Sequence, residues 1–81
     1  MDAKKLKQLT DRYSLDQISA CIHEQLEKGS NNCEVVENTN EVISFLSKAE
    51  VVREFMDHGM TFSEALRELG KKIRAVYGSE D

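Results

Sequence analysis

Four residues of this chain have side chains that commonly bind zinc, namely Cys21, His23, Cys33 and His58. Residues two positions apart on a helix point about 200° away from each other, so Cys21 and His23 cannot face one ion while a helix persists there. The spacing also lacks the usual Cys-x-x-Cys or His-x-x-x-His pairs. We therefore expect no metal and no other cofactor, with Cys21 half-buried beside an apolar stripe and both histidines on the surface.

The same residue types could support nucleophilic catalysis, but the rest of a catalytic site is missing from the sequence. A cysteine nucleophile needs a nearby base and an oxyanion hole, and no Gly-rich turn or nucleophile elbow is present to form one. Carboxylate pairs such as Glu24 with Glu27 and Glu34 with Glu37 are typical of the solvated faces of amphipathic helices. We expect no catalytic residues and no enzymatic activity.

The cysteines and the hydropathy pattern also predict where the protein resides. The N-terminal Met1–Lys7 stretch has no apolar core of a secretory signal, and no window approaches the roughly 18 apolar residues of a membrane span. Two cysteines in such a chain favour reduced thiols over a disulfide framework. The expected location is the cytoplasm, with no membrane partner.

Helix start and stop signals divide the chain into helical segments. There is no proline, and Gly29, Gly59 and Gly78 lie where helices are expected to end. Helix starts are marked by the pairs Ser14 with Gln17, Asn38 with Glu41, and Thr61 with Glu64. These signals predict four helices, over about 3–13, 15–28, 39–58 and 62–77, with Cys33–Glu37 as an extended connector.

Apolar stripes indicate which faces of these helices enter the core. Leu15, Ile18, Ile22 and Leu26 recur at helical spacing in the second segment. The last segment has a narrower stripe at near-heptad spacing, made of Phe62, Leu66, Leu69, Ile73 and Val76. We expect Leu66 and Ile73, at its centre, to be core anchors.

The third segment is too apolar for a helix with one buried face. If the face of Val42, Leu46, Ala49 and Met56 packs inward, Val51 lies about 180° and Phe55 about 140° from the direction of Val42. Either this helix is buried from two sides, or it breaks near Ser47, where Glu50 offers a second capping box. The sequence thus predicts one all-α domain over 1–81, a compact bundle of four short helices, or five if the third breaks.

An unbroken third helix would present Val51 and Phe55 as an apolar patch, with an acidic rim formed by Glu50, Glu54 and Asp57. Such a patch is typical of a protein-binding surface, and homodimerisation is the simplest way to cover it. The expected function is a non-enzymatic protein-interaction or regulatory module whose partner is another protein or a second copy.

The charge distribution bears on nucleic-acid binding, which is the alternative function. The net charge is −4, distributed as +2 over 1–13, −6 over 14–58 and 0 over 59–81. Arg67, Lys71 and Arg74 form a basic ridge on the last segment, but Glu64 and Glu68 alternate with them at salt-bridging offsets, with Glu68 to Lys72 as the favoured pair. A ribbon-helix-helix dimer, with Cys33–Glu37 as its strand, would carry acidic residues towards DNA. Nucleic acid is therefore not the expected partner.

Overall fold

The structure is a computed structural model that describes residues 3–35 and 38–77, with the backbone alone for 75–77. It contains four helices, α1 (Ala3–Arg12), α2 (Leu15–Lys28), α3 (Thr39–Asp57) and α4 (Phe62–Tyr77), and no strand in the described ranges. The predicted all-α bundle of four helices is therefore confirmed. None of the helices within these ranges is both long and apolar enough to cross a membrane.

The predicted capping residues begin three of the helices. Ser14 and Gln17 form the reciprocal bonds of a capping box before α2, with the Ser14 amide donating to the Gln17 side chain at 2.8 Å. The Asn38 side chain accepts from the Glu41 amide at 3.0 Å before α3. Thr61 and Glu64 make a second reciprocal pair before α4, at 2.9 and 3.1 Å. These bonds satisfy backbone donors that a helix start leaves without a partner.

Glycines at the helix ends have the expected left-handed conformation. Gly29, with φ of 76°, caps α2, and Gly59, with φ of 103°, follows the end of α3. A residue with a β-carbon is strained at such angles, which is why glycine ends helices so often. Gly78, predicted to end the last helix, lies outside the described residues.

α3 is a single unbroken helix of 19 residues that contacts α1, α2 and α4. The predicted alternative of a break near Ser47 is wrong, and burial from more than one side is the correct interpretation. Ser47 is exposed, whereas Leu46 and Ala49 on either side of it are fully buried on the same face. A break would pull one of them out of the core, at a cost of about 2 to 5 kcal/mol for a leucine.

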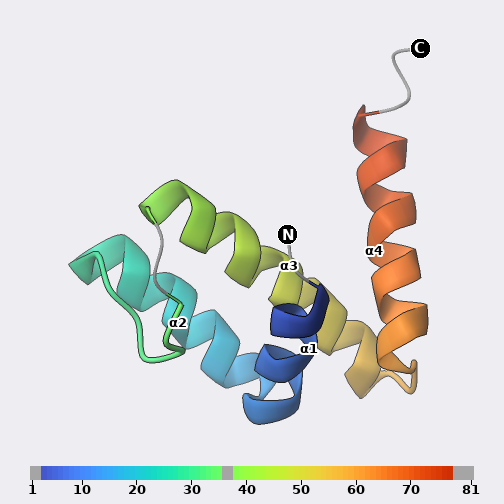
Figure 1. Cartoon of the computed structure of the whole chain (residues 1–81), viewed down its shortest axis with the longest axis horizontal. Helices are drawn as coiled ribbons and strands as arrows, with labels where there is room; N and C mark the ends of the chain where they lie inside the picture. Colours follow the sequence, from blue (N-terminus) through green and yellow to red (C-terminus); the bar gives the residue numbers. More distant parts are fainter. Residues whose placement is uncertain (1–2, 36–37, 78–81) are drawn as a thin grey trace.

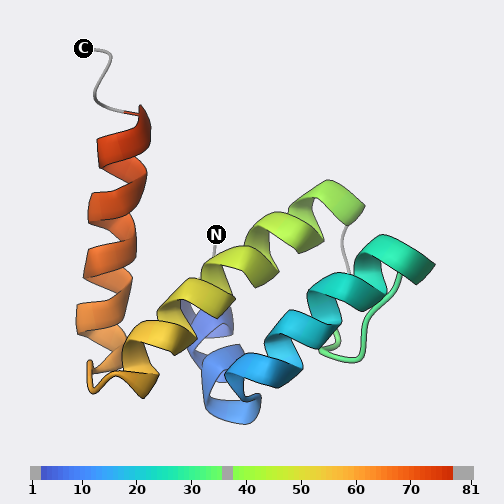
Figure 2. The ribbon, with the colours of Figure 1, turned by 180° about the vertical axis from the view of Figure 1, so that it is seen from behind.

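The helices are arranged around α3, as Figures 1 and 2 show from opposite sides. α2 runs alongside α3, α1 crosses near its middle, and α4 meets its C-terminal end and then extends away from the other three helices. The main core residues from α1, α2 and α3 are Leu6, Leu9, Ile18, Cys21, Val42, Leu46, Ala49 and Val52. Ala65 and Leu69 are the buried residues of α4 within its described side chains.

Two of the predicted stripes are displaced around their helices. Leu26 is 65% exposed, and its neighbour Gln25 is buried instead. Leu66 and Ile73 are only half-buried, so the expectation that they anchor the core is corrected in favour of Ala65 and Leu69. α4 packs mainly against α3, so its buried residues lie on the side of the apolar stripe that faces α3.

The connector between α2 and α3 is joined to α2 by a disulfide between Cys21 and Cys33, whose Cα atoms are 6.1 Å apart. The prediction of reduced thiols is therefore wrong. The two cysteines are 12 positions apart, and the turn after Gly29 folds the connector back along α2 and brings them together. The described residues 30–35 are neither helix nor strand, which rules out a strand at Cys33–Val35 for a ribbon-helix-helix dimer.

Candidate interaction surface

The predicted surface on α3 is partly covered by α4. Val51 and Phe55 are both half-buried and pack against the core. The ammonium nitrogen of Lys72 on α4 lies 5.1 Å from the centre of the Phe55 ring, within the range of a cation–π contact. Lys72 therefore contacts Phe55, and the described ion pair of Glu68 is instead with Lys71. One edge of Phe55 thus meets a cation of the same chain, while Val51 keeps some accessible area.

The predicted acidic rim divides into two parts. Among the described residues, Glu50 and Glu54 have no hydrogen bond or ion pair, and Glu54 is exposed. Asp57, in contrast, has its carboxylate 3.0 Å from Nε of Arg53, in an ion pair whose geometry is not that of a hydrogen bond. The rim that remains available to a partner is therefore Glu50 with Glu54.

Arg53 is a structural residue that sequence reasoning missed. Its Nη1 donates to the carbonyl oxygen of Thr10 at 2.6 Å, which ties the end of α1 to α3. Thr10 is fully buried, so this charged bond satisfies a carbonyl near the end of α1 that lies out of reach of bulk water. The Arg53 to Asp57 spacing of four residues was the available signal for the ion pair, but the contact with α1 depends on the fold.

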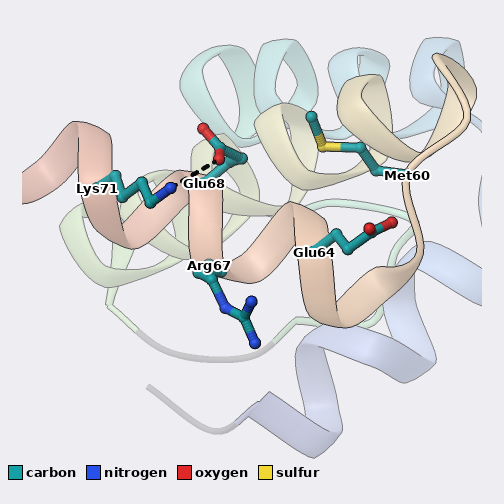
Figure 3. A pocket seen from close by; sticks show the side chains of 5 residues that line it. All are labelled: Met60, Glu64, Arg67, Glu68 and Lys71. Atoms are coloured by element: carbon teal, nitrogen blue, oxygen red, sulfur yellow. Dashed lines mark hydrogen bonds and ion pairs between the residues drawn. The ribbon is translucent and has the colours of Figure 1, made fainter.

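The basic ridge lies on the outer side of α4. Arg67 and Arg74 are exposed, and Nζ of Lys71 lies 3.3 Å from the Glu68 carboxylate. Met60 and Glu64 complete a shallow hollow here, in which Arg67 points away from the Glu68–Lys71 pair (Figure 3). Its volume of about 190 Å³ is below the range of about 300 to 1,000 Å³ for small-molecule sites.

The four residues considered for zinc do not form one common site. Cys21 and Cys33 are bonded to each other, and His23 and His58 are exposed. Within 3–35 and 38–77, no three histidine, cysteine or acidic residues form a group that could hold a metal ion. In the oxidised form neither cysteine has a thiolate to offer a metal.

The buried Gln25 is the centre of a polar cluster that the apolar stripes of the sequence did not predict. Gln25 donates from Nε2 to the Thr39 hydroxyl at 3.0 Å, and its Oε1 accepts from Asn31 at 2.9 Å. The Asn31 carboxamide oxygen in turn accepts from the amides of Cys33 and Val35 at 3.0 and 3.3 Å. One buried amide of α2 thus holds both the connector and the first residue of α3.

Comparison with known proteins found no matching family model, no matching curated protein and no matching solved structure.

Proposed function

We propose that this protein is a non-enzymatic interaction module that associates with a second copy of itself through the face of α3 around Val51. The observation that supports this most is the order of groups around α3. Val51 lies about 40° from Phe55 around the helix axis, and Glu54 and Glu50 follow on its other side, about 60° and 100° from it. Lys72 therefore marks one edge of the apolar strip and the two carboxylates mark the other.

A surface with an acidic edge and a basic edge is complementary to itself. A two-fold axis lying along the apolar strip brings the acidic edge of one copy against the basic edge of the other. Glu50 and Glu54 of one copy then face Lys72 of its partner, while the Val51 side chains meet at the centre. Charge placement of this kind contributes more to orientation than to affinity, so the apolar centre supplies most of the binding free energy.

The mass of the protein in solution, measured by light scattering after gel filtration across a concentration series, tests this proposal. We expect a concentration-dependent dimer, which the Val51→Glu and Phe55→Glu pair of substitutions abolishes. Glu54→Lys brings like charges together in the dimer and should weaken it at least several-fold. Glu27→Lys, the same charge change on an exposed residue of α2, should leave the dimer intact.

Far-UV circular dichroism separates loss of the interface from loss of the fold. Since Val51 and Phe55 also pack inside the monomer, an unfolded double variant would count against a free interface at these residues. Glu54 is exposed, so its reversal should leave the helical signal unchanged. A wild-type protein that is monomeric at all concentrations, or a dimer unaffected by Glu54→Lys, would reject self-association through this face.

Nucleic-acid binding through Arg67, Lys71 and Arg74 has weaker support. Two arginines are exposed, but Lys71 is paired with Glu68 and the molecule carries a net charge of −4. Retention on heparin that falls steeply with salt would favour this alternative. Elution at the lowest salt concentration would favour the protein partner.

The cytoplasm is the proposed compartment. Cytosolic disulfides are usually transient and often redox-sensing, because cellular reductants keep most thiols reduced. In a cytoplasmic location the bond between Cys21 and Cys33 is therefore expected to be reduced or to form only transiently.

A further inference from the structure

We propose that the Cys21–Cys33 disulfide is a redox-responsive latch that holds connector residues 33–35 against α2 and releases them on reduction while the helices remain folded. This inference is independent of the self-association proposed above. It concerns a disulfide and a segment that lie on α2 and the connector, whereas the proposed dimer face belongs to α3 and α4.

The first argument is that the bond acts locally. It joins two residues 12 positions apart and closes a loop within one hairpin, formed by the second half of α2 and the connector. Neither cysteine belongs to α3 or α4, and the packing of α2 on α3 includes Ile18, Val42 and Leu46, which are fully buried and take no part in the bond. Opening the bond therefore leaves the main helix–helix contacts in place.

The second argument is that the ends of the connector have anchors of their own. Gln25 holds Asn31 at one end and Thr39 at the other, and Glu24 accepts two bonds from Asn32, at 3.1 and 2.8 Å. These bonds keep the connector attached at both ends when the disulfide is absent. The part released is Cys33–Val35.

The third argument is that this stretch has a conformational reason to open. Glu34, next to Cys33, has φ of 61°, a left-handed conformation that is unfavourable for residues other than glycine and the small polar residues. Its side chain is exposed, and its ion pair with Arg12, at 3.2 Å, joins two solvated groups and adds little. The covalent bond acts together with the hydrogen bonds between Asn31 and the backbone of Cys33 and Val35, at 3.0 to 3.3 Å, to keep Glu34 in this state, and it is the only covalent constraint among them.

Reduction replaces the covalent bond with weak contacts. A dithiol reductant gives two electrons and two protons to the sulfur–sulfur bond, which becomes two cysteine thiols while the reductant closes its own disulfide. The Cys33 sulfur lies 3.9 Å from the Gln17 carbonyl oxygen in the oxidised form, and the thiol that reduction creates is a weak donor to such an acceptor. Cys21 and Cys33 are 3% and 4% exposed, so the reductant needs an opening motion of the connector to reach them.

Amide hydrogen exchange measured by NMR tests the latch, with and without dithiothreitol. The reporters are the amides of Cys33 and Val35, which donate to Asn31, and the internal references are Val42 and Leu46 in α3. We expect the reporter amides to exchange about tenfold or more faster in the reduced protein, with the references changed by less than about twofold. Reoxidation should restore the original rates.

The Cys21→Ser and Cys33→Ser double variant provides the matched control. Its reporter amides should exchange at the rates of the reduced wild type and should not respond to dithiothreitol. Three results would each overturn the latch: cysteines that stay unpaired under oxidising conditions, equal reporter rates in both redox states, or reference amides that lose protection together with the reporters. The last result would identify the bond as a staple for the whole fold.

Discussion

Gln25 is one of the two buried polar residues in the described part of the chain. A buried amide that lacks hydrogen-bond partners is costly, and Gln25 is tolerated at 3% exposure because Asn31 and Thr39 use both ends of it. The next residue, Leu26, lies in water at 65% exposure. A polar side chain is therefore preferred to an aliphatic one at this point, because the Asn31 amide and the Thr39 hydroxyl beside it provide a donor and an acceptor.

We predict that Gln25→Leu lowers the free energy of unfolding by about 1 to 3 kcal/mol, although leucine is the more apolar residue. The substitution removes the donor to the Thr39 hydroxyl and one of the two acceptors of the Asn31 amide, next to a buried position. Urea denaturation followed by circular dichroism measures the change. Gln8→Leu, on the exposed side of α1, serves as the control and should change stability by less than about 0.5 kcal/mol. A more stable Gln25→Leu protein would show that the polar cluster is dispensable.

At the scale of the element, α4 is the helix least enclosed by the others. Its buried line consists of Ala65, at 0% exposure, and Leu69, at 6%, whereas Leu66 and Ile73 are half-buried. Both leucines belong to the same apolar stripe, so their difference arises from the direction in which α4 meets α3 (Figure 2). The position of a residue relative to the neighbouring helix determines what its removal costs.

This difference predicts unequal effects of two chemically identical substitutions. Leu69→Ala should lower the free energy of unfolding by about 2 to 5 kcal/mol, since it creates a cavity between α4 and α3. Leu66→Ala should cost clearly less, because part of that side chain is already in contact with water. The midpoints of urea denaturation of the two variants measure these losses, provided that the unfolding free energy has the same dependence on urea concentration in both. Equal losses would mean that α4 packs through the centre of its stripe.

At the scale of the whole molecule, the protein is flat, with extents of 37 × 30 × 19 Å. The shortest extent is less than two full helix diameters of about 10 to 12 Å each, so every helix has a face at the surface. A chain of this size buries a smaller fraction of its surface than larger domains do, and its core is correspondingly marginal. A covalent cross-link has a large relative effect on such a fold.

We predict that replacing both cysteines with alanine lowers the free energy of unfolding by at most about 3 kcal/mol, which is the chain-entropy value for a loop of this length. Strain released at Glu34 reduces this loss. Proteins of this length have total stabilities of about 4 to 12 kcal/mol, so the variant should remain folded. Thermal melts of oxidised, reduced and alanine forms measure the difference. A variant without helical signal at 25 °C would contradict both this estimate and the local action of the disulfide.

Local signals in the sequence predict the four helices and where three of them begin. Ser14, Asn38 and Thr61 begin helices, and Gly29 ends one, because capping bonds and left-handed angles involve residues only a few positions apart. The apolar surplus of α3 left two interpretations open, burial on more than one side or a break near Ser47, and the unbroken helix decides for the first. Local chemistry is sufficient for the capping features, since each is decided within about one turn of the chain.

Which face of each helix enters the core depends on packing between segments that are distant in the sequence. The choice of Leu69 over Leu66, the burial of Gln25, the bond from Arg53 to Thr10 and the pairing of Cys21 with Cys33 all depend on which segment lies opposite. Helical periodicity gives the width of an apolar stripe but not its orientation to within a single residue. Two cysteines 12 positions apart pair because a turn at Gly29 reverses the chain and the packing of the connector on α2 brings the two sulfurs together.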